Sequence, residues 1–160
     1  MHFILSLHNL FRWLILLVLI LIIVKAILDI LKIFNKQLQN ETGDLNLFLK
    51  SKEQLRKFSL ILTILVDIQF ILGIILYFFQ SSLMDMWQEI STVMKQRELR
   101  VIIIEHPVLM IIFIALIHYL NVSVKKIETI HQYKKIILIG VISLIILLAG
   151  IPWFRPLIRI

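Results

Sequence analysis

The order of apolar and polar residues divides the chain into four long hydrophobic runs joined by polar links. The runs cover about residues 10–31, 58–79, 101–120 and 136–154, and each is close to the ~20 residues that a helix needs to cross a bilayer. They do not alternate between polar and apolar positions, as the strands of a membrane β-barrel do. The pattern therefore predicts an all-α fold, an integral membrane four-helix bundle forming a single transmembrane domain over 1–160, with helices over about 5–34, 57–80, 101–122 and 135–154.

The links differ in character. Residues 35–56 are polar and predict a loop with a short helix. The link over about 83–97 carries apolar side chains at helical spacing, which predicts an amphipathic helix lying on the membrane surface. The apolar positions of that link are Leu83, Met86, Trp87, Ile90, Val93 and Met94.

Composition supports the membrane class and narrows the chemistry. The chain is 60% hydrophobic, with a mean hydropathy of +0.97, which is too apolar for a soluble domain of this length. It has no cysteine, which excludes disulfides, thiolate-bound iron–sulfur clusters and covalently attached c-type haem. Any metal chemistry must therefore use histidine, methionine or carboxylate ligands.

Most of the 17 lysines and arginines lie in or beside the link between the first two helices or the link between the last two. The positive-inside rule then predicts that both termini and the middle link lie outside, on the periplasmic side of a bacterial cytoplasmic (inner) membrane. The net charge of +7 reflects this bias toward an anionic inner leaflet. The charge therefore indicates a lipid bilayer as partner and gives no reason to expect nucleic-acid binding.

Unusual polar and aromatic residues gather at the predicted outer end of the bundle. They are His8, Arg12 and Trp13 in the first helix, Arg100, Glu105, His106 and Pro107 at the third, and Trp153 and Arg155 at the end of the fourth. One interpretation is structural: the tryptophans anchor the interface, Pro107 begins a helix, and Arg12 pairs with Glu105.

The second interpretation rests on His8 and His106. These histidines come from different helices, at similar predicted depth and in apolar surroundings, and facing imidazoles on bundle helices are a means of holding haem iron. A ligand imidazole needs an acceptor for its second nitrogen, for which Ser6, Asn9 or Glu105 are candidates. Haem propionates would meet arginines at this end, with candidates Arg100, Arg155 and Arg159.

Several short motifs carry a resemblance to a known family. In order they are His8-Asn-Leu-Phe-Arg-Trp13, Asp67-Ile-Gln-Phe-Ile-Leu-Gly-Ile-Ile-Leu-Tyr77, Glu98-Leu-Arg100, Glu105-His-Pro107 and Ile151-Pro-Trp153. Together they resemble a family of small four-helix membrane proteins from Bacteroidota that is commonly labelled "cytochrome B". The resemblance implies haem b and electron transfer. It also implies a histidine where this chain has Asp67, so His8 and His106 are the ligands we expect here.

Asp67 and Gln69 form a further candidate site, because an intramembrane carboxylate is a functional suspect. They suggest a proton path or a quinone contact, while an ion pair between Asp67 and Lys25 is the structural alternative. His118 and His131 suggest either a second haem near the inner face or interfacial histidines beside lysines.

The sequence leaves two classes of function open. The first is a b-type cytochrome-like membrane subunit that binds haem b between the first and third helices. It would pass electrons between the quinone pool, or a membrane oxidoreductase, and a partner. The second is a non-haem accessory or scaffold subunit of a larger envelope or respiratory complex. Either way we expect an electron-transfer or accessory subunit rather than a complete enzyme, in contact with other membrane subunits or with further copies of itself.

Overall fold

The computed structural model describes residues 2–38, 45–79 and 86–153, and within these ranges it is all helical and contains no strand. The long helices are α1 (His2–Leu38), α2 (Leu45–Phe79), α6 (His106–Lys125) and α7 (Ile130–Gly150). Four segments are long and apolar enough to cross a membrane, namely Phe3–Asn35, Asn46–Phe79, Arg97–Lys125 and His131–Gly150. The predicted fold of four long apolar helices is confirmed.

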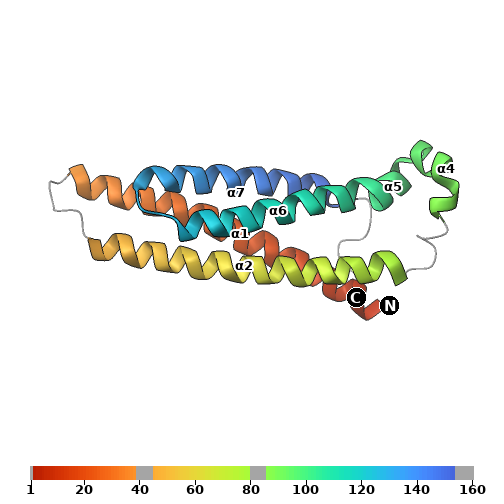
Figure 1. Ribbon diagram of the computed structural model, residues 1–160, viewed down its shortest axis with the longest axis horizontal. Helices are drawn as coiled ribbons and strands as arrows, with labels where there is room; N and C mark the ends of the chain where they lie inside the picture. Colours follow the sequence, from red (N-terminus) through yellow and green to blue (C-terminus); the bar gives the residue numbers. More distant parts are fainter. Residues whose placement is uncertain (1, 39–44, 80–85, 154–160) are drawn as a thin grey trace.

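The four helices form a ring in which α1 packs against α2 and α7, while α6 packs against the same two neighbours. Figure 1 shows that α1 and α6 begin at one end of the bundle, where α2 and α7 finish. We call this end the histidine end, because His8 and His106 lie there. The core between the helices is aliphatic, with Leu19, Leu62 and Ile117 fully buried, and it holds the ring together by excluding solvent from apolar surface.

The outward faces of the helices are also apolar. Ile71, Ile111 and Ile145 are each more than half exposed, and similar side chains surround the bundle. A soluble protein rarely exposes contiguous apolar surface of this extent. The surface is therefore the kind that a bundle presents to lipid.

Several helix limits differ from the predicted ones, most clearly in α2 and α7. Helix α2 begins at Leu45 instead of about 57, because its polar first turns are still amphipathic: Leu55 is buried, while Glu53 and Lys57 pair across one turn at 2.7 Å. Helix α7 begins at Ile130 instead of about 135, behind a Thr129 capping box. It ends at Gly150, two residues before Pro152.

The predicted amphipathic helix over 83–97 is wrong as a single helix. Residues 83–85 lie outside the described ranges, and the remainder forms the short helices η1 (Trp87–Glu89), α4 (Ile90–Lys95) and α5 (Arg97–Arg100). The extended backbone of Gln96 (φ −99°, ψ 110°) separates α4 from α5. The break lets Val93 pack against Ile103 in a small separate cluster. One apolar side chain of the predicted stripe is therefore buried inside the protein.

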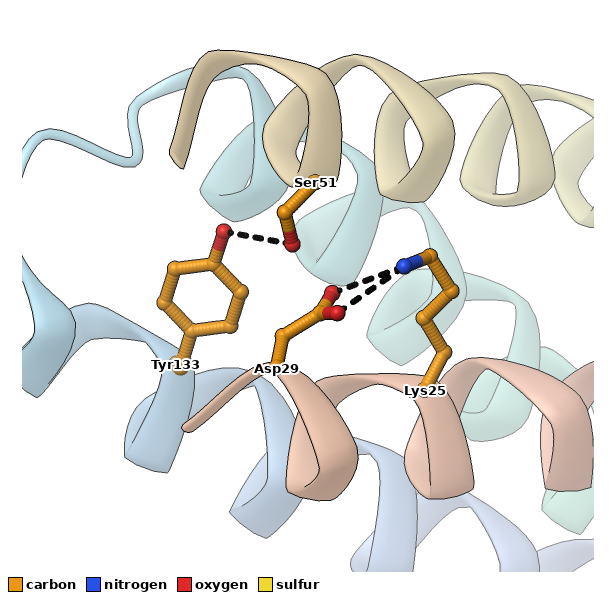
Figure 2. Close-up of polar contacts among 4 residues, drawn as sticks. All are labelled: Lys25, Asp29, Ser51 and Tyr133. Carbon is orange, nitrogen blue, oxygen red and sulfur yellow. Dashed lines mark hydrogen bonds and ion pairs between the residues drawn. The ribbon is translucent and has the colours of Figure 1, made fainter. Parts of the chain in front are cut away.

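The opposite end of the bundle contains a buried polar cluster (Figure 2). The Lys25 ammonium donates to both carboxylate oxygens of Asp29, at 2.9 and 3.0 Å, and the Tyr133 hydroxyl donates to Ser51 Oγ at 3.3 Å. Asp29, Ser51 and Tyr133 are buried. Lys25 is thus paired within its own helix, and the alternative that it neutralises Asp67 is not what the structure contains.

Candidate functional site

A cavity lies inside the bundle at the histidine end. Its volume is about 420 Å³, within the range of small-molecule and cofactor sites. All four long helices contribute to its wall, which is apolar except for a few side chains: His8, Asn9, Arg12, Gln69, Tyr77 and His106. A polar ligand group in this cavity would therefore meet one of these side chains.

His8 and His106 face one another across the helices α1 and α6. Their ring centroids are 6.3 Å apart, and the ring planes are inclined at 74°. An imidazole nitrogen lies about 2 Å from a metal that it binds, so two rings on opposite sides of one ion have centroids roughly 6 Å apart. The separation of the two histidines matches that arrangement.

The His106 ring is held by the end of α7. Its Nδ1 lies 2.7 Å from the backbone oxygen of Gly150, and a carbonyl can only accept, so Nδ1 carries the proton and Nε2 is the basic nitrogen. A hydrogen bond from the second nitrogen to a backbone carbonyl is the usual way in which a ligand imidazole is oriented. Sequence reasoning proposed Ser6, Asn9 or Glu105 for this role and missed Gly150, because a backbone acceptor leaves no side-chain signal.

His8 is held less completely. Among the described residues its buried Nδ1 has no hydrogen-bond partner, and neither does Oε1 of Gln69. The amide of Gln69 donates instead to the backbone oxygen of His8 at 2.9 Å. Buried polar atoms without a partner are rare and call for an explanation, and a ligand in the adjoining cavity is one.

Gly73 keeps space open beside the His8 ring. A Cβ placed on Gly73 would lie 3.5 Å from His8 Cε1, so any larger side chain would fill the cavity between α2 and α1. This glycine is part of the motif that begins at Asp67.

A short π-helix, η2 (Val101–Glu105), leads into His106. In such a turn residues five apart share a face, and this spacing brings Arg100 Nε to 2.7 Å from Glu105 Oε1. The Tyr77 hydroxyl donates to the oxygen of Ile103 in η2 at 3.2 Å. Single π turns inside helices occur often at functional sites.

The structure separates the remaining candidate residues. The ion pair of Glu105 is with Arg100 and not the predicted one with Arg12; the Arg12 guanidinium lines the cavity and lies 5.4 Å from the Trp13 ring. The Trp153 indole donates to the backbone oxygen of Leu148 at 2.9 Å. Arg155 and Arg159 lie outside the described residues.

Asp67 and Gln69, which the sequence grouped together, lie on different faces of α2. Gln69 belongs to the cavity wall. Asp67 Oδ1 instead lies 2.9 Å from Nε2 of His118 on α6, and both side chains are 49% exposed on the outside of the bundle. The two positions are therefore two separate sites.

Comparisons with known proteins add no assignment: the chain matches no family model, no curated protein and no solved structure. Within the described ranges no three histidine, aspartate or glutamate side chains are grouped so as to hold a metal ion.

Proposed function

We propose that the chain is a b-type cytochrome-like membrane subunit that binds haem b between α1 and α6. The observation that carries the proposal is the pair of imidazoles, 6.3 Å apart at the centroids, at a cavity of about 420 Å³. The unpartnered Nδ1 of His8 and the open space beside Gly73 support it, since both fit a group that is bound there.

Each residue of the site would have a defined task. His8 and His106 would hold the haem iron through ring nitrogens, and the Gly150 carbonyl would fix the tautomer of His106. The positive charge of Arg12 in the cavity wall would suit a haem propionate, while Arg100 lies at the same end and pairs with Glu105. Bound haem b supplies a reversible one-electron couple, and the protein sets its potential through ligands, burial and nearby charge.

The proposal includes an exchange of electrons with two kinds of partner. The chain would exchange electrons between the quinone pool, or a membrane oxidoreductase, and a partner at the histidine end. The distribution of lysines and arginines favours the periplasmic side of a bacterial inner membrane for that end and for both termini. The apolar outer surface of the bundle supports the membrane location.

The alternative is a non-haem accessory subunit in which the same residues clasp the helices. The hydrogen bonds from His106 to Gly150, from Gln69 to His8 and from Tyr77 to Ile103 favour it, because each ties two helices together. In that case the histidines serve packing alone, and the cavity would hold lipid or detergent.

Histidine variants separate the two functions. We expect wild-type protein, purified in detergent from cells supplied with haem, to show a sharp Soret band and resolved α and β bands after reduction. His8→Ala and His106→Ala should each abolish this spectrum, because each removes an axial ligand. His131→Ala is the matched control, since His131 lies at the other end of α7, and it should keep the spectrum. Colourless wild-type protein would favour the accessory subunit.

A further inference from the structure

Asp67 and His118 form a polar pair on the outside of the bundle, where α2 and α6 lie side by side (Figure 1). Each side chain is 49% exposed, and Asp67 Oδ1 lies 2.9 Å from His118 Nε2. Around the pair the outward side chains are apolar, among them Ile64, Ile71 and Ile111. The pair is therefore a polar island on an apolar face.

Asp67 lies far from both ends of the apolar part of α2, whereas His118 lies seven residues before Lys125 on α6, about 10 Å along the axis. Asp67 lies ten residues after Lys57 and twelve before Phe79, which places it about 15 and 18 Å from them along the helix axis. An aspartate side chain is too short to extend over such a distance to the headgroups. Exposed ionisable groups at this depth are costly in lipid, and they normally face protein or a water-filled space.

The hydrogen-bonding capacity of the pair is half used. Asp67 uses Oδ1 and His118 uses Nε2, while within the described chain Asp67 Oδ2 and His118 Nδ1 have no partner. A protonated imidazole has two N–H donors, and a carboxylate has two acceptor oxygens. One further donor and one further acceptor, placed side by side at the same depth, would complete the pair.

We propose that this face binds a second copy of the chain, with a twofold axis parallel to the helices. Such an axis leaves each residue at the same depth in the membrane and places α2 of one copy opposite α6 of the other. Asp67 would therefore face the partner's His118, and His118 would face the partner subunit's Asp67. With a protonated imidazole, each group then gains the hydrogen bond that it lacks. The twofold contact is self-complementary, as an isologous interface requires.

The surface next to the pair suits close helix packing. Ala115, one turn before His118 on α6, is exposed, and small residues let transmembrane helices approach closely. The opposite face of the ring, formed by α1 and α7, offers no such combination: its outward side chains between Leu138 and Ile145 are apolar. Charge complementarity therefore places the second copy on the α2–α6 face.

Cysteine cross-linking tests the interface in native membranes, because the chain has no cysteine of its own. Ala115→Cys should be joined into a dimer by a flexible bis-maleimide cross-linker, because the twofold axis places α6 of each copy against α2 of its partner and leaves the two Ala115 positions near the axis but too far apart for a direct disulfide. Ile142→Cys, exposed on α7, is the matched control and should stay monomeric. The proposal is overturned if Ala115→Cys forms no more dimer than Ile142→Cys, or if it cross-links to a different polypeptide. Neither result depends on haem binding.

Complementation tests the pairing across the twofold axis. In the Ala115→Cys background, Asp67→Leu and His118→Leu should each reduce the cross-linked dimer several-fold, since every cross-interface pair is lost. Co-expressed with different tags, the two variants should form heterodimers above the statistical share, because a mixed dimer regains one pair of Asp67 with the partner's His118. Random pairing of the two variants, or dimerisation equal to that of the parent, would contradict the proposal.

Discussion

At the scale of the residue, two glycines face neighbours at different distances. A Cβ on Gly140 would lie 2.8 Å from Cγ1 of Ile23, closer than side-chain atoms normally approach. At Gly73 the corresponding contact, with His8 Cε1, would be 3.5 Å, an ordinary van der Waals distance. Gly140 therefore permits α7 to approach α1, whereas Gly73 borders open space.

The two glycines give a matched pair of variants. Gly140→Ala should lower the free energy of unfolding of the haem-free protein by about 1–3 kcal/mol, because overpacking displaces Ile23 or the helices. Gly73→Ala makes the same chemical change and should leave stability almost unaltered. Thermal unfolding in one detergent measures both. Equal losses in the two variants would show that helix approach at Gly140 is not as the structure has it.

The sequence predicted which residues form the candidate site more readily than it predicted which groups those residues contact. His8 and His106 stand out because imidazoles are rare in apolar runs, and the structure does bring them together. Their neighbours depend on details that no pattern records. Glu105 pairs with Arg100 because a π turn puts residues five apart on one face, and His106 is oriented by a backbone carbonyl.

At the scale of the element, one tyrosine connects the link to the bundle. The Tyr77 hydroxyl accepts a hydrogen bond from the Trp87 indole at 2.9 Å and donates to Ile103 in η2 at 3.2 Å. Helix α2 thereby holds both the beginning of the link and the π turn before His106. The short helices of the link bury few side chains, so this contact is an important restraint on them.

Removing that hydroxyl should loosen the link selectively. We expect Tyr77→Phe to cost about 1 kcal/mol, as is usual for a partly exposed hydrogen bond, and to speed amide hydrogen exchange in residues 86–100. Exchange in α1 and α7 should not change. Tyr119→Phe is the control, because the contact of Tyr119 with Lys135 uses the ring and not the hydroxyl. Equal exchange in both variants would contradict the restraining role of Tyr77.

The sequence predicted helices correctly only where the length of an apolar run determines them. Lipid-length runs fix the existence of four helices, whereas local contacts fix the ends: the Thr129 capping box starts α7, and the backbone of Gln96 divides the link. The periodic stripe over 83–97 was consistent with one helix, but packing of Val93 on Ile103 took precedence. The packing of Val93 on Ile103 joins residues of different helices and cannot be read from the spacing within the stripe.

At the scale of the whole molecule, the ring of four helices places two kinds of polar site on different sides of one apolar shell. The cavity with His8 and His106 is lined by all four long helices, while Asp67 and His118 lie on the outside of the ring. Hydropathy predicts the bundle but not the rotation of each helix, because runs that are apolar on every side carry a weak periodic signal. The sequence therefore placed Asp67 beside Gln69, and only the fold shows that they lie on different faces of α2.

The central claim is that His8 and His106 together hold one haem iron in the cavity. Electron paramagnetic resonance of the oxidised, detergent-purified wild type tests it most directly, with haem content measured on the same sample. Two imidazole ligands predict a low-spin ferric signal from one haem per chain. A high-spin ferric signal would show that one of the two axial positions lacks its imidazole, and protein without haem iron would contradict the claim altogether.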